Sequence, residues 1–90
     1  MLIHRIKSKF IKEDQILTKQ DCVTIIRGRG FNQDSEFSFS KGSFSYRTQI
    51  DVYDTKVWIK AYCDGYGESE TIHFPITKKQ LLAFIRSNAV

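Results

Sequence analysis

The sequence predicts an α+β domain: an antiparallel β-meander of four to five strands with a C-terminal α-helix packed on one face. Two observations support this fold class. Between Glu36 and Ile76, apolar and polar residues alternate with a period of two, in stretches that turn residues separate. From residue 77 onward, apolar residues instead recur every three or four positions, as in an amphipathic helix. The chain has 90 residues, the length of one domain, so we expect a single compact domain over residues 1–90.

The N-terminal third leaves two interpretations open. The stretch Val23–Ile26 is rich in β-branched residues, which favour a strand at about 22–30. The alternative is a short helix that Thr18 and Asp21 cap and that Gly28 ends. We prefer the strand, which would join the meander as its fifth member.

Turn residues divide the rest of the chain into strands. The expected turns hold Gly, Asn, Asp or Ser and lie at Asn32–Ser35, Lys41–Gly42, Asp54–Thr55 and Asp64–Gly67. These turns fix a register in which apolar side chains gather on one face of the sheet, whereas a slip of one residue would move them to the other face. The expected cross-strand pairs are Phe37 with Tyr46, Phe39 with Phe44, Val52 with Val57, Ile50 with Ile59, Ile59 with Ile72, and Val57 with Phe74.

A helix is expected to cover this apolar face and complete the core. Thr77 is a suitable N-cap, and Gln80 stands at the third helical position, as in a capping box. An apolar stripe follows, and Asn88 can end the helix; the stripe consists of Leu81, Leu82, Ile85 and Ala89. The aromatic residues expected in the core are Phe37, Phe39, Phe44, Tyr46 and Phe74, with Phe84 at its margin.

The same alternation predicts which side chains point away from the helix. This outward face holds the only Trp of the chain among tyrosines and basic residues, which are types enriched at binding hot spots. Trp58 is expected beside His73, and Glu36 is expected across from Arg47. The residues assigned to partner binding are Trp58, Tyr62, Arg47, Lys60, Tyr53 and His73.

Basic residues concentrate toward the two ends of the chain, which has a formal net charge of +4. Residues 1–12 hold four basic side chains and no acidic one, whereas residues 48–76 are more acidic than basic. This distribution is expected to steer the protein toward a partner with an acidic surface. The residues assigned to steering are Arg5, Lys7, Lys9, Arg27 and Arg29.

Few residues could support catalysis. The only histidines are His4 and His73, and the only cysteines, Cys22 and Cys63, are far apart in the sequence. The expected register places Cys63 and His73 on opposite faces of the sheet, so they cannot form a nucleophilic pair. The four residues also lack the spacing of a zinc site. We therefore expect a protein that is not an enzyme, with two free thiols, no cofactor and no metal site.

These features favour a small protein-binding module. We expect it to act as an inhibitor, encoded by a phage or mobile element, that occupies a surface of a larger host protein or nucleoprotein complex. Two alternatives stay open: a single-stranded DNA or RNA binder that stacks bases on the same face, and a homodimer. No apolar run reaches the ~18–20 residues of a membrane span, and no signal peptide is evident, so we expect a cytoplasmic protein without a membrane partner.

Overall fold

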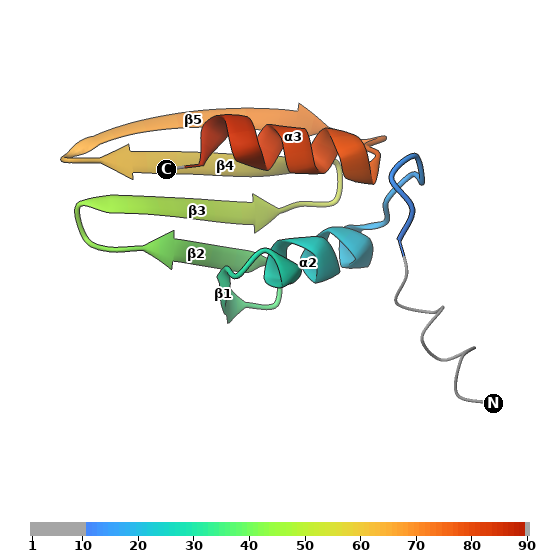
Figure 1. The fold of residues 1–90 in the computed structure, drawn as a ribbon, viewed down its shortest axis with the longest axis horizontal. Coiled ribbons are helices and arrows are strands. Elements are labelled where there is room, and N and C mark those ends of the chain that lie inside the picture. Colours follow the sequence, from blue (N-terminus) through green and yellow to red (C-terminus); the bar gives the residue numbers. More distant parts are fainter. Residues whose placement is uncertain (1–10, 90) are drawn as a thin grey trace.

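Within residues 11–89, five strands form one antiparallel sheet in the order β1-β2-β3-β4-β5, and two helices cover one of its faces (Figure 1). The strands are β1 (Asn32–Ser35), β2 (Ser38–Gly42), β3 (Tyr46–Val52), β4 (Lys56–Cys63) and β5 (Tyr66–His73), and the helices are α2 (Lys19–Gly28) and α3 (Lys78–Asn88). This computed structural model describes residues 11–89. The predicted α+β meander with a C-terminal helix is confirmed, because every strand pairs with its neighbour in sequence and α3 contacts β4 and β5.

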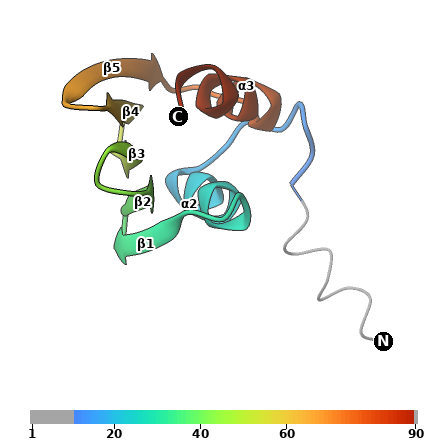
Figure 2. The same cartoon turned by 60° about the vertical axis from the view of Figure 1, so that its left-hand side comes forward.

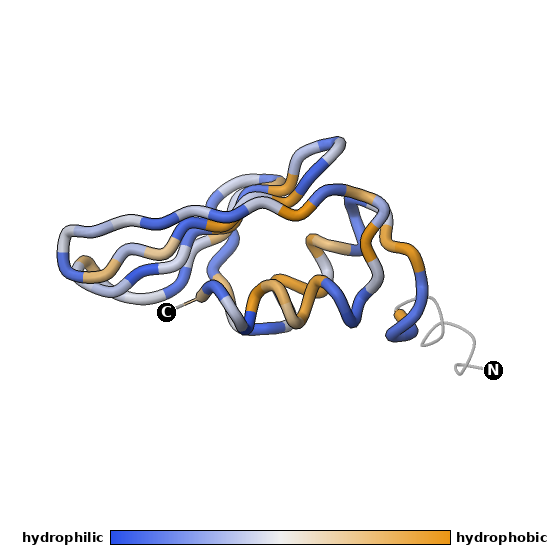
Figure 3. The backbone as a smooth tube through the Cα atoms, turned by 90° about the horizontal axis from the view of Figure 1, so that it is seen from above, coloured by the Kyte–Doolittle hydropathy of each residue, from blue (hydrophilic) through white to orange (hydrophobic). Residues whose placement is uncertain are grey.

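Both helices lie on the same side of the sheet. Figure 2 shows them together on one face, and within residues 11–89 no helix or strand covers the other face. The apolar segments lie where the sheet and the helices face one another (Figure 3). The strands supply Phe39, Ile50, Val52, Val57 and Ile59 to this core, and each of these side chains is buried. Of the helices in the described part of the chain, none is long and apolar enough to cross a membrane.

The first described element, α2, is a helix, so the predicted strand at 22–30 is wrong and the alternative is correct. Thr18 caps α2: its hydroxyl accepts from the Asp21 N–H at 3.0 Å, and the Asp21 carboxylate accepts from the Thr18 N–H at 2.9 Å. This reciprocal capping box outweighs the modest strand preference of β-branched residues. The buried residues Cys22, Val23, Ile25 and Ile26 follow the spacing of one helical face.

The first strand of the sheet, β1, lies at Asn32–Ser35, where the sequence analysis expected only a turn. A change of register between Gln33 and Ser35 interrupts its pairing with β2. Gly30, between α2 and β1, has a φ of +88°, which allows the chain to reverse direction there. The fifth strand is thus present, but it is formed by different residues from those predicted.

The β2–β3 hairpin has a different register from the one predicted. Phe39 pairs with Ile50 rather than with Phe44, because the tight turn lies at Phe44–Ser45 and not at Lys41–Gly42. Gly42 is required for another reason: a Cβ atom on it would collide with the carbonyl oxygen of Tyr46. The expected proximity of Glu36 and Arg47 is also wrong, since Arg47 pairs with Gly42.

The other two hairpins follow the prediction more closely. The turn at Asp54–Thr55 is confirmed, and Val52 pairs with Val57 as expected. The predicted pairs of Ile59 with Ile72 and of Val57 with Phe74 centre the last turn on Gly65–Tyr66, but it is centred one residue earlier, on Asp64–Gly65. Asp64 and Gly65 have positive φ values of 53° and 92°. This is the backbone of a type I′ turn, for which Asp-Gly is a favoured pair. As a result Trp58 pairs with Thr71 rather than with His73.

The C-terminal helix matches its prediction. In the capping box of α3, the Thr77 hydroxyl accepts from the Gln80 N–H at 3.2 Å, and the Gln80 side chain accepts from the Thr77 N–H at 2.9 Å. Leu81 and Ile85 are buried, Leu82 and Ala89 pack against the core, and the helix ends at Asn88 as expected.

Residues 11–17, which precede α2, form hydrogen bonds with residues around the start of α3. The Leu17 N–H donates to the Ile76 carbonyl at 2.8 Å, and the Lys79 N–H donates to the Glu13 carbonyl at 3.0 Å. Lys78 Nζ donates to the carbonyl of Ile11, 67 residues away in the sequence, at 3.0 Å. These bonds attach residues 11–17 to the start of α3.

Candidate functional site

The face of the sheet that no described helix covers holds all six residues assigned to partner binding. Ile50 and Ile59 point toward the helices, so their neighbours on β3 and β4 point away, because side chains alternate along a strand. The outer face of the sheet is the name used below for this surface. Its central residues are Arg47, Gln49, Asp51, Tyr53, Lys56, Trp58, Lys60 and Tyr62, with Gly67, Ser69, Thr71 and His73 along β5.

A group of two cations and one aromatic ring lies on this face. Arg47 is directly opposite Tyr62, and its guanidinium carbon is 4.5 Å from the centre of the Tyr62 ring. Lys60 Nζ lies 4.9 Å from the same ring. Such cation–π contacts contribute about 0.5–1 kcal/mol each at exposed sites and hold the long side chains in place. The Arg47–Tyr62–Lys60 cluster is therefore stabilised by contacts within the chain itself.

Gly67 on β5 makes room for this cluster. A Cβ atom at Gly67 would lie 2.7 Å from Lys60 Cε and 3.4 Å from Tyr62 Cδ1. The first distance is too short for two carbon atoms, so any larger residue at this position would displace the lysine. The small size of Gly67 thus contributes to the arrangement of Lys60 over the Tyr62 ring.

Trp58 occupies the middle of the outer face and is half-buried there. Asp51 lies directly opposite it on β3, and Thr71 lies opposite it on β5. Toward the other end of the face, Lys56 Nζ lies 5.6 Å from the centre of the Tyr53 ring, and His73 pairs with Lys56. Among these central residues, Asp51 is the single acidic side chain beside Arg47, Lys56 and Lys60, so the centre of the face is basic.

The residues assigned to steering are not part of this face. Arg27 lies in the last turn of α2, on the helical side, and its Nη1 donates to Gln33 Oε1 at 3.2 Å. Arg29 follows α2 at its C-cap. Arg5, Lys7 and Lys9 lie outside the described residues. The structure therefore brings together the six face residues but keeps Arg27 and Arg29 away from them.

Three exposed aromatic side chains near the hairpin turns were missed by the sequence analysis. Phe44 is 96% exposed, Tyr66 is 81% exposed and Tyr46 is 54% exposed, so the prediction that Phe44 and Tyr46 are buried is wrong. Tyr46 and Tyr66 both pair with Cys63, one from each side. Their side chains point to the side of the sheet that the helices cover elsewhere.

The reason for this exposure is a mismatch in length. An α-helix of 11 residues such as α3 is about 16 Å long, whereas a strand of 8 residues such as β4 or β5 is about 26 Å long. The hairpin ends of β3, β4 and β5 therefore extend beyond the helices (Figure 1). This exposure could have been predicted from the sequence. The stretches of alternating residues are longer than the helix that covers them, so the residues at their ends must remain uncovered.

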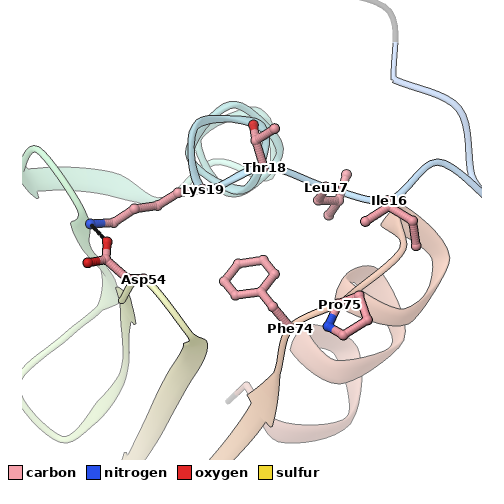
Figure 4. Close-up of a pocket in the computed structure, with 7 residues that line it drawn as sticks. All are labelled: Ile16, Leu17, Thr18, Lys19, Asp54, Phe74 and Pro75. Carbon is pink, nitrogen blue, oxygen red and sulfur yellow. Dashed lines mark hydrogen bonds and ion pairs between the residues drawn. The ribbon is translucent and has the colours of Figure 1, made fainter.

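A groove of about 400 Å³ lies at the opposite end of the sheet (Figure 4). It is lined by Ile16, Leu17, Thr18, Lys19, Asp54, Phe74 and Pro75. Lys19 Nζ and Asp54 Oδ1 form an ion pair at 3.0 Å beside it, and the Thr18 hydroxyl already caps α2. Its charged groups therefore neutralise each other, and this groove is a weaker candidate for function than the outer face.

The two cysteines have different environments, and this difference gives a testable prediction. Both are free, Cys22 being fully buried in α2 and Cys63 exposed at the end of β4. Burial, with a smaller effect from the Asp21 carboxylate, raises the pKa of the Cys22 thiol from 9.0 to about 12. Alkylation followed by mass spectrometry at pH 8 is expected to modify Cys63 and to leave Cys22 intact until urea unfolds the chain.

The raised pKa also predicts how stability depends on pH. The folded protein retains the Cys22 proton to a higher pH than the unfolded chain, in which the pKa is near 9.0. This contribution to stability is therefore complete below pH 9 and is lost as the pH rises from 9 toward 12. Cys22→Ala should remove that part of the alkaline loss, and equal losses in both proteins would contradict this assignment.

Comparison of the chain with models of known protein families, with curated protein sequences and with solved structures returned no match. The candidate function therefore rests on the outer face itself.

Proposed function

We propose that the protein is a small, non-enzymatic binding module whose outer sheet face occupies an acidic surface of a larger protein. The observation that supports this best is the placement of Trp58 beside the Arg47–Tyr62–Lys60 cluster on a face that no described helix covers. Trp, Tyr and Arg are the residue types that most often dominate binding energy. An inhibitor from a phage or mobile element, acting on a host protein or nucleoprotein complex, fits this proposal.

The charge of the face favours a negatively charged partner. Arg47, Lys56 and Lys60 supply positive charge, which would accelerate association with an acidic surface. The Asp51 carboxylate, directly opposite Trp58, would repel phosphates and protein carboxylates alike, so the nuclease-treated capture described below separates a protein partner from a nucleic acid.

The proposal places the protein in the cytoplasm. Two free thiols, one of them exposed, are the expected state in a reducing compartment. Binding in that setting would not require a disulfide, a metal or a cofactor.

Affinity purification from a nuclease-treated extract of the source cells, with quantitation of the retained proteins, tests the proposal. Trp58→Ala is expected to weaken capture of the same partner by about 30-fold, the equivalent of about 2 kcal/mol, because a hot-spot side chain is lost. Lys60→Glu is expected to act in the same direction through charge, without removing a large apolar side chain. Thr24→Ala, on the far side of the molecule, is the matched control and should retain the partner fully.

Two results would overturn the proposal. One is unchanged capture by both outer-face variants when their melting temperatures match that of the parent protein. The other is capture that nuclease abolishes, together with oligonucleotide binding that falls steeply with salt, which would identify a nucleic-acid binder instead. Sedimentation of the purified protein over a range of concentrations identifies a homodimer through this face.

A further inference from the structure

The outermost strand β5 presents an open edge of unusual regularity. It spans Tyr66–His73 at the end of the sheet, and its register with β4 is continuous over eight residue pairs. Within residues 11–89, no other strand pairs with its far side. The opposite edge is different, because β1 has only 4 residues and an irregular register. Short or bulged edges resist the addition of a further strand, whereas a long regular edge invites it.

The backbone groups available at this edge can be identified. The Phe74 N–H donates to the Thr55 carbonyl at 3.0 Å, in the same register as the β4–β5 pairs. Because hydrogen-bonded pairs alternate along an antiparallel ladder, the even-numbered residues of β5 bond to β4. The N–H and C=O groups of Gly67, Ser69 and Thr71 therefore point toward the open side.

The side chains of β5 differ between the two faces of the sheet: most are small and uncharged on the outer face, and two are acidic on the helical side. Gly67, Ser69 and Thr71 are small and lie on the outer face. Glu68 and Glu70 are exposed on the helical side, next to a hollow of about 320 Å³. The hollow is lined by Ala61, Cys63, Tyr66, Glu68, Glu70, Ser87, Asn88 and Ala89.

The hollow is negative for two independent reasons. Glu68 and Glu70 contribute two carboxylates, and residues 61–70 contain no basic side chain. The C-terminal end of α3, which includes Asn88, lines the same hollow. The carbonyl groups at a helix C-terminus carry partial negative charge and favour cations.

We propose that β5 binds an extended segment of a partner protein, which adds to the sheet as a sixth strand and directs alternate Lys or Arg side chains toward Glu68 and Glu70. Main-chain hydrogen bonds to Gly67, Ser69 and Thr71 would supply affinity, and the two carboxylates would select a basic sequence. This inference does not depend on the outer-face proposal, because it uses the edge of the sheet and the opposite charge.

A second copy of the chain is a poorer occupant of this edge in the registers that pair most of β5 with itself. If two copies paired antiparallel around residue 68, 69 or 70, Glu68 or Glu70 of one copy would lie opposite Glu68 or Glu70 of the other. Like charges directly opposite on neighbouring strands destabilise the pair. A basic strand from another protein avoids this repulsion.

The test uses the whole ¹⁵N-labelled chain and an acetylated, amidated (Thr-Lys)₄ peptide, with (Thr-Glu)₄ as the matched control. Addition of (Thr-Lys)₄ is expected to shift the amide resonances of Gly67, Ser69 and Thr71 and to slow their hydrogen exchange. (Thr-Glu)₄ should bind at least about tenfold more weakly, a difference of about 1.4 kcal/mol.

Three variants separate backbone pairing from charge. Ser69→Pro removes an N–H that faces the open edge without removing a bond to β4, and should weaken binding about tenfold, whereas Ser69→Ala should not. The double variant Glu68→Lys, Glu70→Lys should reverse the preference and bind (Thr-Glu)₄.

The proposal is overturned if Ser69→Pro and Ser69→Ala bind the peptide equally, or if millimolar peptide shifts no β5 resonance. Peptide-induced shifts confined to β3 and β4, with none at Gly67 or Ser69, would likewise overturn it and leave the outer-face proposal standing. Shifts of β5 that depend on protein concentration without peptide would assign the edge to a second copy, against this inference.

Discussion

Phe39→Ala is expected to lower the free energy of unfolding by about 3–5 kcal/mol, the usual cost of removing a buried Phe ring. Phe39 is fully buried in β2 and pairs with Ile50, in the part of the sheet that the helices cover. The stability of natural domains is typically about 5–15 kcal/mol, so this single change should remove a large part of it. Urea denaturation followed by far-UV circular dichroism measures the difference.

Phe44→Ala is the matched control for this prediction. The same ring is deleted, but Phe44 is 96% exposed in the β2–β3 turn, so the change in stability should stay within about 0.5 kcal/mol. The register predicted from the sequence places Phe44 opposite Phe39 in the core, so it would predict a large loss of stability for Phe44→Ala. Equal losses for Phe39→Ala and Phe44→Ala would therefore contradict the observed register.

Thr24→Pro is expected to destabilise the protein by about 3 kcal/mol or more, because proline inside a helix removes a backbone hydrogen bond and clashes with the preceding turn. Thr24 is exposed in the middle of α2, so the substitution changes the backbone without disturbing the core. Denaturation in urea, followed by far-UV circular dichroism, measures the loss of stability.

Thr24→Ala controls for the loss of the side chain at this position. It removes the bond from Thr24 Oγ1 to the Gln20 carbonyl, 3.2 Å long, but alanine has the highest helix propensity. Its stability should remain within about 0.5 kcal/mol of the parent protein. If the proline and alanine variants were equally stable, a helix at residues 19–28 would be contradicted.

The sequence predicts on which face of the sheet each side chain lies, even where it predicts the wrong cross-strand partner. Phe39 pairs six residues away from its predicted partner Phe44, and Val57 pairs two residues away from Phe74. Both shifts are even, and an even shift leaves every side chain on its predicted face. The placement of Trp58 and its neighbours on the outer face therefore survives both errors.

Where the sequence analysis was wrong, weak local signals competed. In residues 19–28, β-branched side chains favoured a strand, whereas the Thr18–Asp21 capping box and the helical spacing of apolar residues favoured a helix. In the β2–β3 hairpin, Gly42 was taken as a turn residue, although its role is to let the chain approach the Tyr46 carbonyl. Local propensity alone could not rank these possibilities, because packing against α3 and the sheet decides between them.

The bonds between residues 11–17 and the start of α3 have a consequence for the order of folding. Each hairpin of the meander closes a loop of only a few residues, which is entropically inexpensive and takes about 1–10 µs for an isolated hairpin. The contact between Lys78 and the Ile11 carbonyl instead closes a loop of 67 residues. The sheet can therefore assemble hairpin by hairpin, and the segment before α2 would be the last to join, closing the chain around a nearly finished core.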